Sequence, residues 1–281
     1  MKKNLMGAVS ALLVVGCTHM AVAAETPIER GRALMNGIVA CGNCHTPQTP
    51  NGPDNSRELA GGPPIVEPGV FKAFAPNITP DMETGIGTWT DAEIIRAIRE
   101  GKRRDGSTMG PPMPYGLYRH VSDEDMAAIV AYLRSVPPVR SESPKSEYSF
   151  PLPPAWVPPA APVAPISKDD PVAYGAYLAG PLGHCIECHS TPNEKGQPDI
   201  ENELGAGGMA FHGPWGTSVA PNITPNGIGD WTDAEIAKAI TTGVRRDGRR
   251  IMPPMAIPYY ATMSPSEVKA IVAYLRTLPP K

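Results

Sequence analysis

The chain has 281 residues, which is enough for two domains of ordinary size. Its hydrophobic content of 41% excludes disorder throughout, and its formal net charge of −3 gives no support for nucleic-acid binding. The 35 prolines and the low aromatic content of 6% favour small compact units separated by extended chain over one large core.

Residues 1–24 have the pattern of a signal peptide. Lys2 and Lys3 provide a positive start, and residues 5–15 form an apolar run that is too short for a typical membrane span. Small residues follow at 21–24, so we expect cleavage before Glu25 and a mature protein in the periplasm. No later stretch is long and apolar enough to span a membrane.

A second processing site competes with this one. Val-Val-Gly-Cys at residues 14–17 resembles a bacterial lipoprotein box, in which Cys17 would be lipidated and would become the mature N-terminus. In the alternative, Cys17 is discarded with the leader. Both routes export the protein, and only the first would associate it with a membrane through the lipid on Cys17.

The next feature is Cys-Gly-Asn-Cys-His at residues 41–45, which recurs as Cys-Ile-Glu-Cys-His at 185–189. This pattern is typical of covalent haem attachment, in which two thiols bond to haem vinyl groups and the histidine ligates iron. A redox dithiol or half of a zinc site is the alternative, but a zinc site would need both Cys pairs within one small module. The sequence therefore predicts two haem c groups, attached to Cys41, Cys44, His45, Cys185, Cys188 and His189.

The two motifs belong to a long internal repeat. Ala-Pro-Asn-Ile-Thr-Pro begins at residue 75 and again at 220, and Ala-Ile-Val-Ala-Tyr-Leu-Arg begins at 128 and again at 270. The two haem motifs are 144 residues apart, whereas the copies of the later sequence are 142 residues apart. The chain therefore contains two copies of one domain that differ by small insertions.

Each copy is predicted to be helical, with no convincing alternation typical of a strand. The last helix has apolar side chains at i, i+3, i+4 and i+7, and we expect this face to pack on the first helix at Gly31 or Gly175. A middle helix should begin at a capping box and end at a glycine, and the last helix should begin at a serine. In the two copies these residues are Thr90, Glu93, Gly101 and Ser122, and Thr232, Glu235, Gly243 and Ser264.

Residues 137–167 separate the copies and are rich in proline. We expect an extended, semi-rigid linker, which could instead wrap over one domain and hold the pair at a fixed distance. The predicted organisation is thus a signal peptide (1–24), a first domain (25–136), a proline-rich linker (137–167) and a second domain (168–281).

The sixth iron ligand determines the function, because methionine there favours electron transfer and an open position permits chemistry. Of the methionines after each haem motif, only Met113 and Met255 match between the copies, each within Pro-Pro-Met. Prolines stiffen such a loop. We therefore predict that His45 and Met113 ligate one iron and that His189 and Met255 ligate the other.

Other side chains admit two interpretations. Trp89 and Trp231 match between the copies, as do Asn77 and Asn222; they could donate to haem propionates, or fill the pocket wall and build a turn. The arginines at 103–104 and 245–246 could pair with propionates, dock an acidic redox partner, or form a solvated loop. The unmatched His120, His184 and His212 are not expected to be iron ligands.

The motif at the start of each copy, the late methionine and the closing Tyr-Leu helix resemble class I cytochrome c domains. Asn-Ile-Thr-Pro, Thr-Gly-Ile-Gly-x-Trp, Arg-Arg-Asp-Gly and Pro-Pro-Met-Pro-Tyr resemble the cytochrome c subunits of bacterial membrane-bound alcohol, aldehyde and gluconate dehydrogenases. Those subunits usually carry three such domains, and here the second copy has Ala256 after its methionine. The resemblance implies an all-α fold of two tandem class I cytochrome c domains joined by the proline-rich linker.

The predicted function is a periplasmic dihaem electron carrier without catalytic residues. It would take electrons from a dehydrogenase subunit or another donor and pass them to another cytochrome or a terminal oxidase. The alternative is a dihaem redox enzyme, a peroxidase or a thiosulfate-oxidising cytochrome, in which one haem lacks a methionine ligand. The matched Met113 and Met255 favour the electron carrier.

Overall fold

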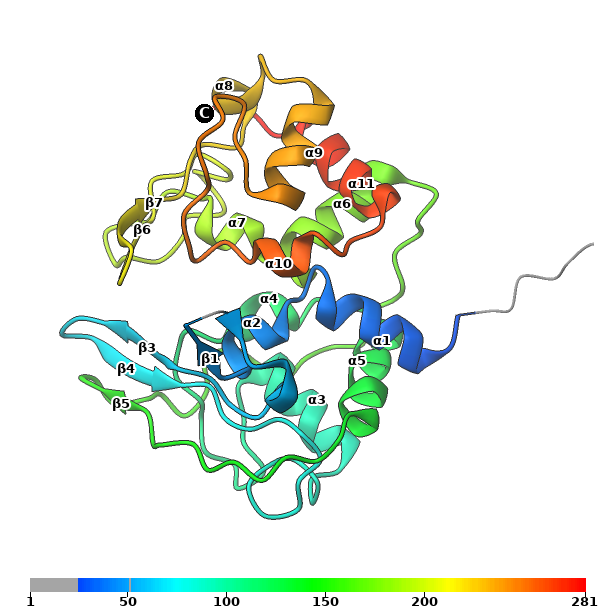
Figure 1. Cartoon of the computed structure of the whole chain (residues 1–281), viewed down its shortest axis with the longest axis vertical. Coiled ribbons are helices and arrows are strands. Elements are labelled where there is room, and N and C mark those ends of the chain that lie inside the picture. Colours follow the sequence, from blue (N-terminus) through cyan, green and yellow to red (C-terminus); the bar gives the residue numbers. More distant parts are fainter. Residues whose placement is uncertain (1–24, 51) are drawn as a thin grey trace, which may run out of the picture.

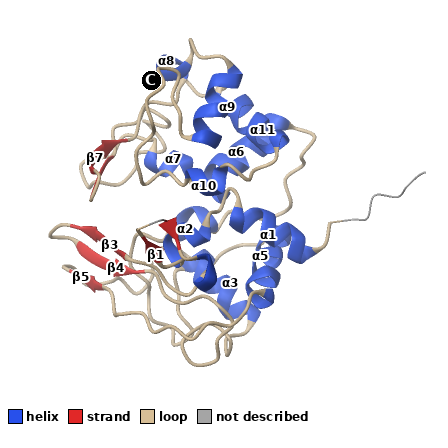
Figure 2. Cartoon of the chain, in the orientation of Figure 1, coloured by secondary structure: helices blue, strands red, loops and turns tan. Residues whose placement is uncertain are grey.

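The structure is a computed structural model that describes residues 25–50 and 52–281 (Figure 1). The predicted signal peptide and Cys17 lie outside the described residues. Two helix-rich halves lie one above the other, and short strands project from the same side of both (Figure 2). Within the described part of the chain, no helix has both the length and the apolar character of a membrane span. We call the half formed by residues 25–136 the first repeat and that formed by 168–281 the second repeat.

The helices of the first repeat are α1 (Pro27–Asn36), α2 (Cys41–His45), the 3₁₀ helix η1 (Asn55–Arg57), α3 (Asp91–Glu100), α4 (Tyr115–Tyr118) and α5 (Asp123–Ser135). Those of the second repeat are α6 (Pro171–Tyr177), the π-helical η2 (Leu178–Leu182), α7 (Cys185–Cys188), α8 (Pro225–Ile228), α9 (Asp233–Thr242), α10 (Ile257–Tyr260) and α11 (Pro265–Leu275). The strands are β1 (Gln48–Thr49), β2 (Gly52–Pro53), β3 (Pro64–Glu67), β4 (Phe71–Phe74), β5 (Glu147–Tyr148), β6 (Ala210–Gly213) and β7 (Gly216–Val219).

The predicted helix ends are confirmed. Thr90 and Glu93 form a reciprocal capping box at the start of α3, which ends at Gly101 in the left-handed conformation. Helix α9 begins and ends in the same way at Thr232, Glu235 and Gly243. The side chains of Ser122 and Ser264 cap α5 and α11, also as predicted.

The first and last helices of each repeat cross in close contact, as the sequence predicts. A Cβ atom added to Gly31 in α1 would lie 2.0 Å from the backbone oxygen of Ala128 in α5. The equivalent distance in the second repeat, from Gly175 in α6 to the oxygen of Ala270 in α11, is 1.9 Å. Only glycine permits so close a backbone approach. The residue type at these two positions therefore determines how each pair of helices packs.

The predicted absence of strands is wrong. Strands β3 and β4 form an antiparallel hairpin, β6 and β7 form its counterpart in the second repeat, and β1 pairs with β2. These strands have at most four residues, too few for an alternating pattern to be recognised in the sequence. The fold is helix-rich with small sheets, so the description as all-α is too simple.

The proline-rich segment 137–167 contains no helix, and it lies against the first repeat. Strand β5, which lies within it, pairs with β4 and makes a three-stranded sheet in the order β3-β4-β5. The carbonyl oxygens of Val139 and Val163 also accept hydrogen bonds from Asn77 and Asp123 of the first repeat. Of the two arrangements expected for this segment, the structure shows the one that wraps over a domain.

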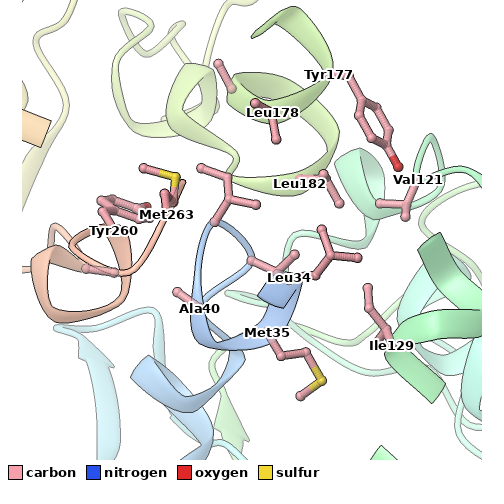
Figure 3. Close-up of a cluster of buried hydrophobic side chains, with 14 of the residues drawn as sticks. Leu34, Met35, Ala40, Val121, Ile129, Tyr177, Leu178, Leu182, Tyr260 and Met263 are labelled. Atoms are coloured by element: carbon pink, nitrogen blue, oxygen red, sulfur yellow. The ribbon is translucent and has the colours of Figure 1, made fainter. Parts of the chain in front are cut away.

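The two repeats share a continuous hydrophobic core. Leu34 in α1 and Ile129 in α5 belong to the same buried cluster as Leu178 and Leu182 of the second repeat (Figure 3). Met263, which follows α10, belongs to it as well. Figure 3 shows these side chains converging from both halves. Burial of apolar area across the boundary therefore holds the repeats together.

A buried polar network crosses the same boundary. Arg30 in α1 pairs with Asp125 in α5 through a 2.7 Å contact, and their side chains are only 13% and 10% exposed. From the second repeat, the hydroxyl of Tyr177 donates to Asp125 at 2.8 Å and accepts from the backbone N–H of Ser122 at 3.0 Å. Glu267 in α11 lies 3.6 Å from Arg30. The charges are thus paired where water is largely excluded.

We expect Gly31→Ala and Gly175→Ala each to destabilise the protein by at least about 2 kcal/mol, because the new methyl group would push the two helix backbones apart. Chemical unfolding of the haem-loaded protein measures this. Gly116→Ala is the matched control, since nothing lies within 4 Å of a Cβ at Gly116 in α4. Equal stability of all three variants would show that the helix contact does not depend on glycine.

We expect Asp125→Ala to cost about 3–5 kcal/mol of folding free energy, because it leaves the Arg30 guanidinium buried without its partner. The double variant Arg30→Met/Asp125→Leu should recover most of that loss, since an apolar pair needs no compensation. Glu83→Ala, at an ion pair whose side chains are 64% and 65% exposed, should change stability by less than about 1 kcal/mol. A double variant as unstable as Asp125→Ala would contradict the account.

Candidate functional site

Each Cys-x-x-Cys-His motif lies on a short helix that begins after a sharp turn of the chain. Ala40, before α2, has φ +49°, and His184, before α7, has φ +41°. Non-glycine residues are uncommon in this left-handed region, and such strain is typical of functional sites. The same strained conformation in both repeats shows that it is part of the fold and orients the motif helix in the same way.

The two motif histidines are held by matched hydrogen bonds. Nδ1 of His45 lies 2.8 Å from the carbonyl oxygen of Pro76, and Nδ1 of His189 lies 2.8 Å from that of Pro221. A ring whose Nδ1–H donates to a carbonyl keeps the lone pair of Nε2 available for a metal. Burial lowers the pKa of both imidazoles, which favours the neutral form that ligates iron.

The environment of the four cysteines does not suit thiolate chemistry. All four are free and only partly exposed. Burial, with the second cysteine of the motif nearby, raises the pKa of Cys41 to about 12, and burial raises that of Cys185 to about 11. Redox dithiols depend on a lowered thiol pKa, so this alternative is disfavoured. Within residues 25–50 and 52–281, no three His, Cys, Asp or Glu side chains gather as a metal-ion site.

The two matched methionines occupy equivalent loops. Met113 and Met255 each follow a cis Pro-Pro bond, and the carbonyl oxygen of each accepts the N–H two residues later. Both are half-buried and pack against the shared core, as do Cys41 and Cys185. Met252, by contrast, is 46% exposed. Each predicted methionine ligand therefore packs, like its haem motif, against the core that the two repeats share.

The arginine pairs and the matched tryptophans line equivalent surface hollows. Trp89, Arg103 and Arg104 line one, together with Asp105. The hollow in the second repeat is lined by Asp230, Trp231, Arg245, Arg246 and Asp247. The buried Nε of Arg245 has no hydrogen-bond partner among the described residues, since the nearest carboxylate oxygen, of Asp247, is 3.9 Å away. An unpaired buried donor beside a tryptophan suits a haem propionate, so the hollow of the second repeat fits the predicted cofactor.

The matched asparagines build turns. Oδ1 of Asn77 accepts from the backbone N–H and hydroxyl of Thr79, and its amide donates to Thr84 and to the carbonyl oxygen of Val139. Asn222 makes the same two bonds to Thr224 and donates to the carbonyl oxygen of Lys281. Their hydrogen-bonding groups are therefore engaged within the protein, which confirms the turn interpretation.

Two buried tyrosines lie beside the haem motifs at the contact between the repeats. Tyr118 in α4 packs edge-on against His184, with 6.1 Å between ring centroids. Tyr260 in α10 occupies the equivalent position, and both tyrosines are buried. Burial is the largest cause that raises the pKa of Tyr260 well above its ordinary value. The nearby thiols of Cys185, Cys188 and Cys44 raise it further. Sequence reasoning missed this tyrosine pair, although the two residues match at the repeat spacing of 142.

The methionine loop of the first repeat is covered by the proline-rich segment. The hydroxyl of Tyr148 donates to the carbonyl oxygen of Pro111 at 3.1 Å, and Nε1 of Trp156 donates to that of Met109 at 2.8 Å. In the second repeat, the hydroxyl of Ser218 donates to the carbonyl oxygen of Pro253, which corresponds to Pro111. The two loops are therefore alike in backbone but differ in what covers them.

The family model of cytochrome c matches residues 28–137 and 172–279, so the chain belongs to the cytochrome c family. It is 33% identical over 284 residues to the cytochrome c subunit of a quinone alcohol dehydrogenase from Gluconobacter oxydans, and it is 34% identical over 271 residues to the cytochrome subunit of a fructose dehydrogenase from Gluconobacter japonicus. These alignments cover 94% and 90% of the chain. The chain spans only 57% and 53% of those two longer proteins.

A diheme cytochrome c-type protein from Cereibacter sphaeroides has a similar length. It is 29% identical over 313 residues, and the alignment covers 99% of both chains. Membership of the family supports haem c as the cofactor. It confirms the resemblance drawn from the motifs, both to cytochrome c and to the cytochrome subunits of dehydrogenases.

Proposed function

We propose that the mature chain is a dihaem electron carrier of the periplasm and not an enzyme. It takes electrons from a dehydrogenase or another donor and delivers them to a respiratory acceptor, such as another cytochrome or a terminal oxidase. The relatives named as dehydrogenase cytochrome subunits support a dehydrogenase as the partner. The signal-peptide pattern of residues 1–24 supports export, and a lipid on Cys17 would attach the protein to a membrane.

The repeated site carries this proposal. Each repeat has a motif helix after a left-handed residue, a histidine whose Nδ1 lies 2.8 Å from a proline carbonyl oxygen, and a methionine directly after Pro-Pro. We assign one covalent haem c to the first repeat, residues 25–136, and one to the second repeat, residues 168–281. The residues that hold them are Cys41, Cys44, His45 and Met113, and Cys185, Cys188, His189 and Met255.

Haem iron, when bound, supplies one-electron redox chemistry. The protein's own residues determine whether each haem only transfers electrons or also binds external ligands. The prolines before Met113 and Met255 limit the freedom of the two loops, so that a thioether stays in place and excludes external ligands. The carbonyl oxygens of Pro76 and Pro221 orient the histidines and increase their basicity.

We expect the reduced holoprotein not to bind carbon monoxide, because a methionine closes each iron. Met113→Ala and Met255→Ala should each allow one equivalent to bind, as measured by the visible spectrum. Met252→Ala is the control, since that side chain is exposed and unmatched, and it should bind none. Binding by the unmodified protein would show an open haem and would favour the peroxidase or thiosulfate-oxidising alternative.

We expect Trp156→Phe to loosen the loop of Met113 alone, because it removes the hydrogen bond to the carbonyl oxygen of Met109. A bond worth about 1 kcal/mol corresponds to a roughly fivefold change in equilibrium. Imidazole should therefore displace one methionine at about fivefold lower concentration, with the second phase of the titration unchanged. Trp215→Phe, at an exposed turn, should change neither phase; an equal shift of both phases would contradict this role.

A further inference from the structure

The two repeats differ most at the edge of their larger hairpins. In the first repeat, the outer edge of β4 is paired with β5 from the proline-rich segment. In the second repeat, the structure describes a sheet of two strands only, and no strand lies beside the outer edge of β7. Both hairpins project from the same side of the molecule (Figure 1). An edge that is filled in one copy and open in the other is a ready template for strand addition.

The hairpins correspond residue by residue, which identifies the open groups. Phe74 pairs with Pro64 and is followed by Ala-Pro-Asn; Val219 pairs with Ala210 and is followed by the same sequence. In β4 the outward positions are Lys72, which pairs with Glu147, and Phe74, whose N–H donates to the hydroxyl of Ser146 at 2.9 Å. The corresponding outward positions of β7 are Thr217 and Val219.

The surface beside the outer edge of β7 is apolar and exposed, whereas the proline-rich segment covers the corresponding surface of the first repeat. Val219 is 58% exposed, Met252 is 46% exposed and Trp215 is 36% exposed. Met252 belongs to the methionine loop, which lies against β7 because Ser218 donates to the carbonyl oxygen of Pro253 at 2.6 Å. In the first repeat, Tyr148 and Trp156 cover the equivalent loop. Within residues 168–281 the structure describes no third strand at this edge, and no tyrosine or tryptophan donates to a carbonyl oxygen of the loop as Tyr148 and Trp156 do in the first repeat.

The charge of this surface is the third property that a segment binding there must match, after the open strand edge and the apolar surface. In the first repeat, the covering segment passes Thr108, whose hydroxyl donates to the carbonyl oxygen of Pro154 at 2.9 Å. The equivalent residue of the second repeat is Arg250, which is exposed and bridges to Val244 as Thr108 bridges to Lys102. A chain following the same path would meet a guanidinium there, and a carboxylate is the group that complements it.

We propose that the outer edge of β7, with the loop of residues 251–255, is the docking site for an extended segment of the redox partner polypeptide. This segment adds a strand to β7, places an aromatic side chain over the loop and presents a carboxylate to Arg250. The inference rests on the proposed electron-transfer function, because the partner is the donor or acceptor. The proposal places the contact with the partner on the second repeat, because the proline-rich segment of the chain covers the same face of the first repeat.

The probe is a synthetic peptide with the sequence of residues 144–158, which fills this face in the first repeat. Added to the holoprotein, it should bind in a saturable manner and slow the hydrogen exchange of the Thr217 and Val219 amides. Val219→Pro removes one outward N–H and blocks strand addition, so affinity should fall about tenfold or more. Val219→Thr keeps the N–H and should bind as the unmodified protein does.

A second experiment tests the proposed contact between a carboxylate and Arg250. A peptide carrying the change Pro154→Asp should bind about twofold more tightly, and this gain should be lost in Arg250→Ala. No gain, or a gain that survives in Arg250→Ala, overturns that part of the proposal. No binding of the original peptide, or binding unaffected by Val219→Pro, overturns the docking site.

Two further measurements, of self-association and of carbon monoxide binding, show which part of the account is wrong if it fails. Self-association of the protein alone, abolished by Val219→Pro, would make a second copy of the chain the occupant and overturn the assignment to a redox partner. Carbon monoxide binding, measured on the same samples, reports on the haems independently. Failed docking with both haems closed rejects the docking site alone, whereas an open haem in the unmodified protein rejects the proposed function alone.

Discussion

The contact between the first and last helices of each repeat is the constraint on which the other features depend. At Gly31 and Gly175 the space for a side chain is occupied by the backbone of the facing helix. The first helix leads directly into the haem motif, and the last helix follows the methionine loop. The close crossing therefore holds together the helix that precedes the histidine and the helix that follows the methionine, although these two helices are far apart in the chain.

The two repeats then meet at one interface. The shared core supplies apolar burial, and the network around Arg30, Asp125 and Tyr177 adds directional contacts that define how the halves meet. The interface is not symmetric in its chemistry, because Tyr174 stands where the first repeat has Arg30. The asymmetry continues outside, where the chain covers one methionine loop and leaves the other exposed.

Local patterns in the sequence predict much of this structure. The capping boxes, the terminal glycines and the apolar face of α5 depend on neighbours within a few residues, so the sequence alone identifies them. The strands have four residues or fewer, and Tyr177 meets Asp125 52 residues away, so neither leaves a local signal. Comparison of the repeats found Met113 and Met255 as a pair, yet it could not show that only one of their loops is covered.

Redox titration of the mature protein, combined with its intact mass, tests the dihaem electron carrier most directly. The account predicts a mass equal to that of the processed polypeptide plus two haems. It also predicts two one-electron transitions, with both irons low-spin in each oxidation state. A mass that corresponds to a single haem, or a haem that is high-spin without added ligand, would contradict it. Either result would mean that the matched sets of cysteines, histidine and methionine do not both form closed haem sites.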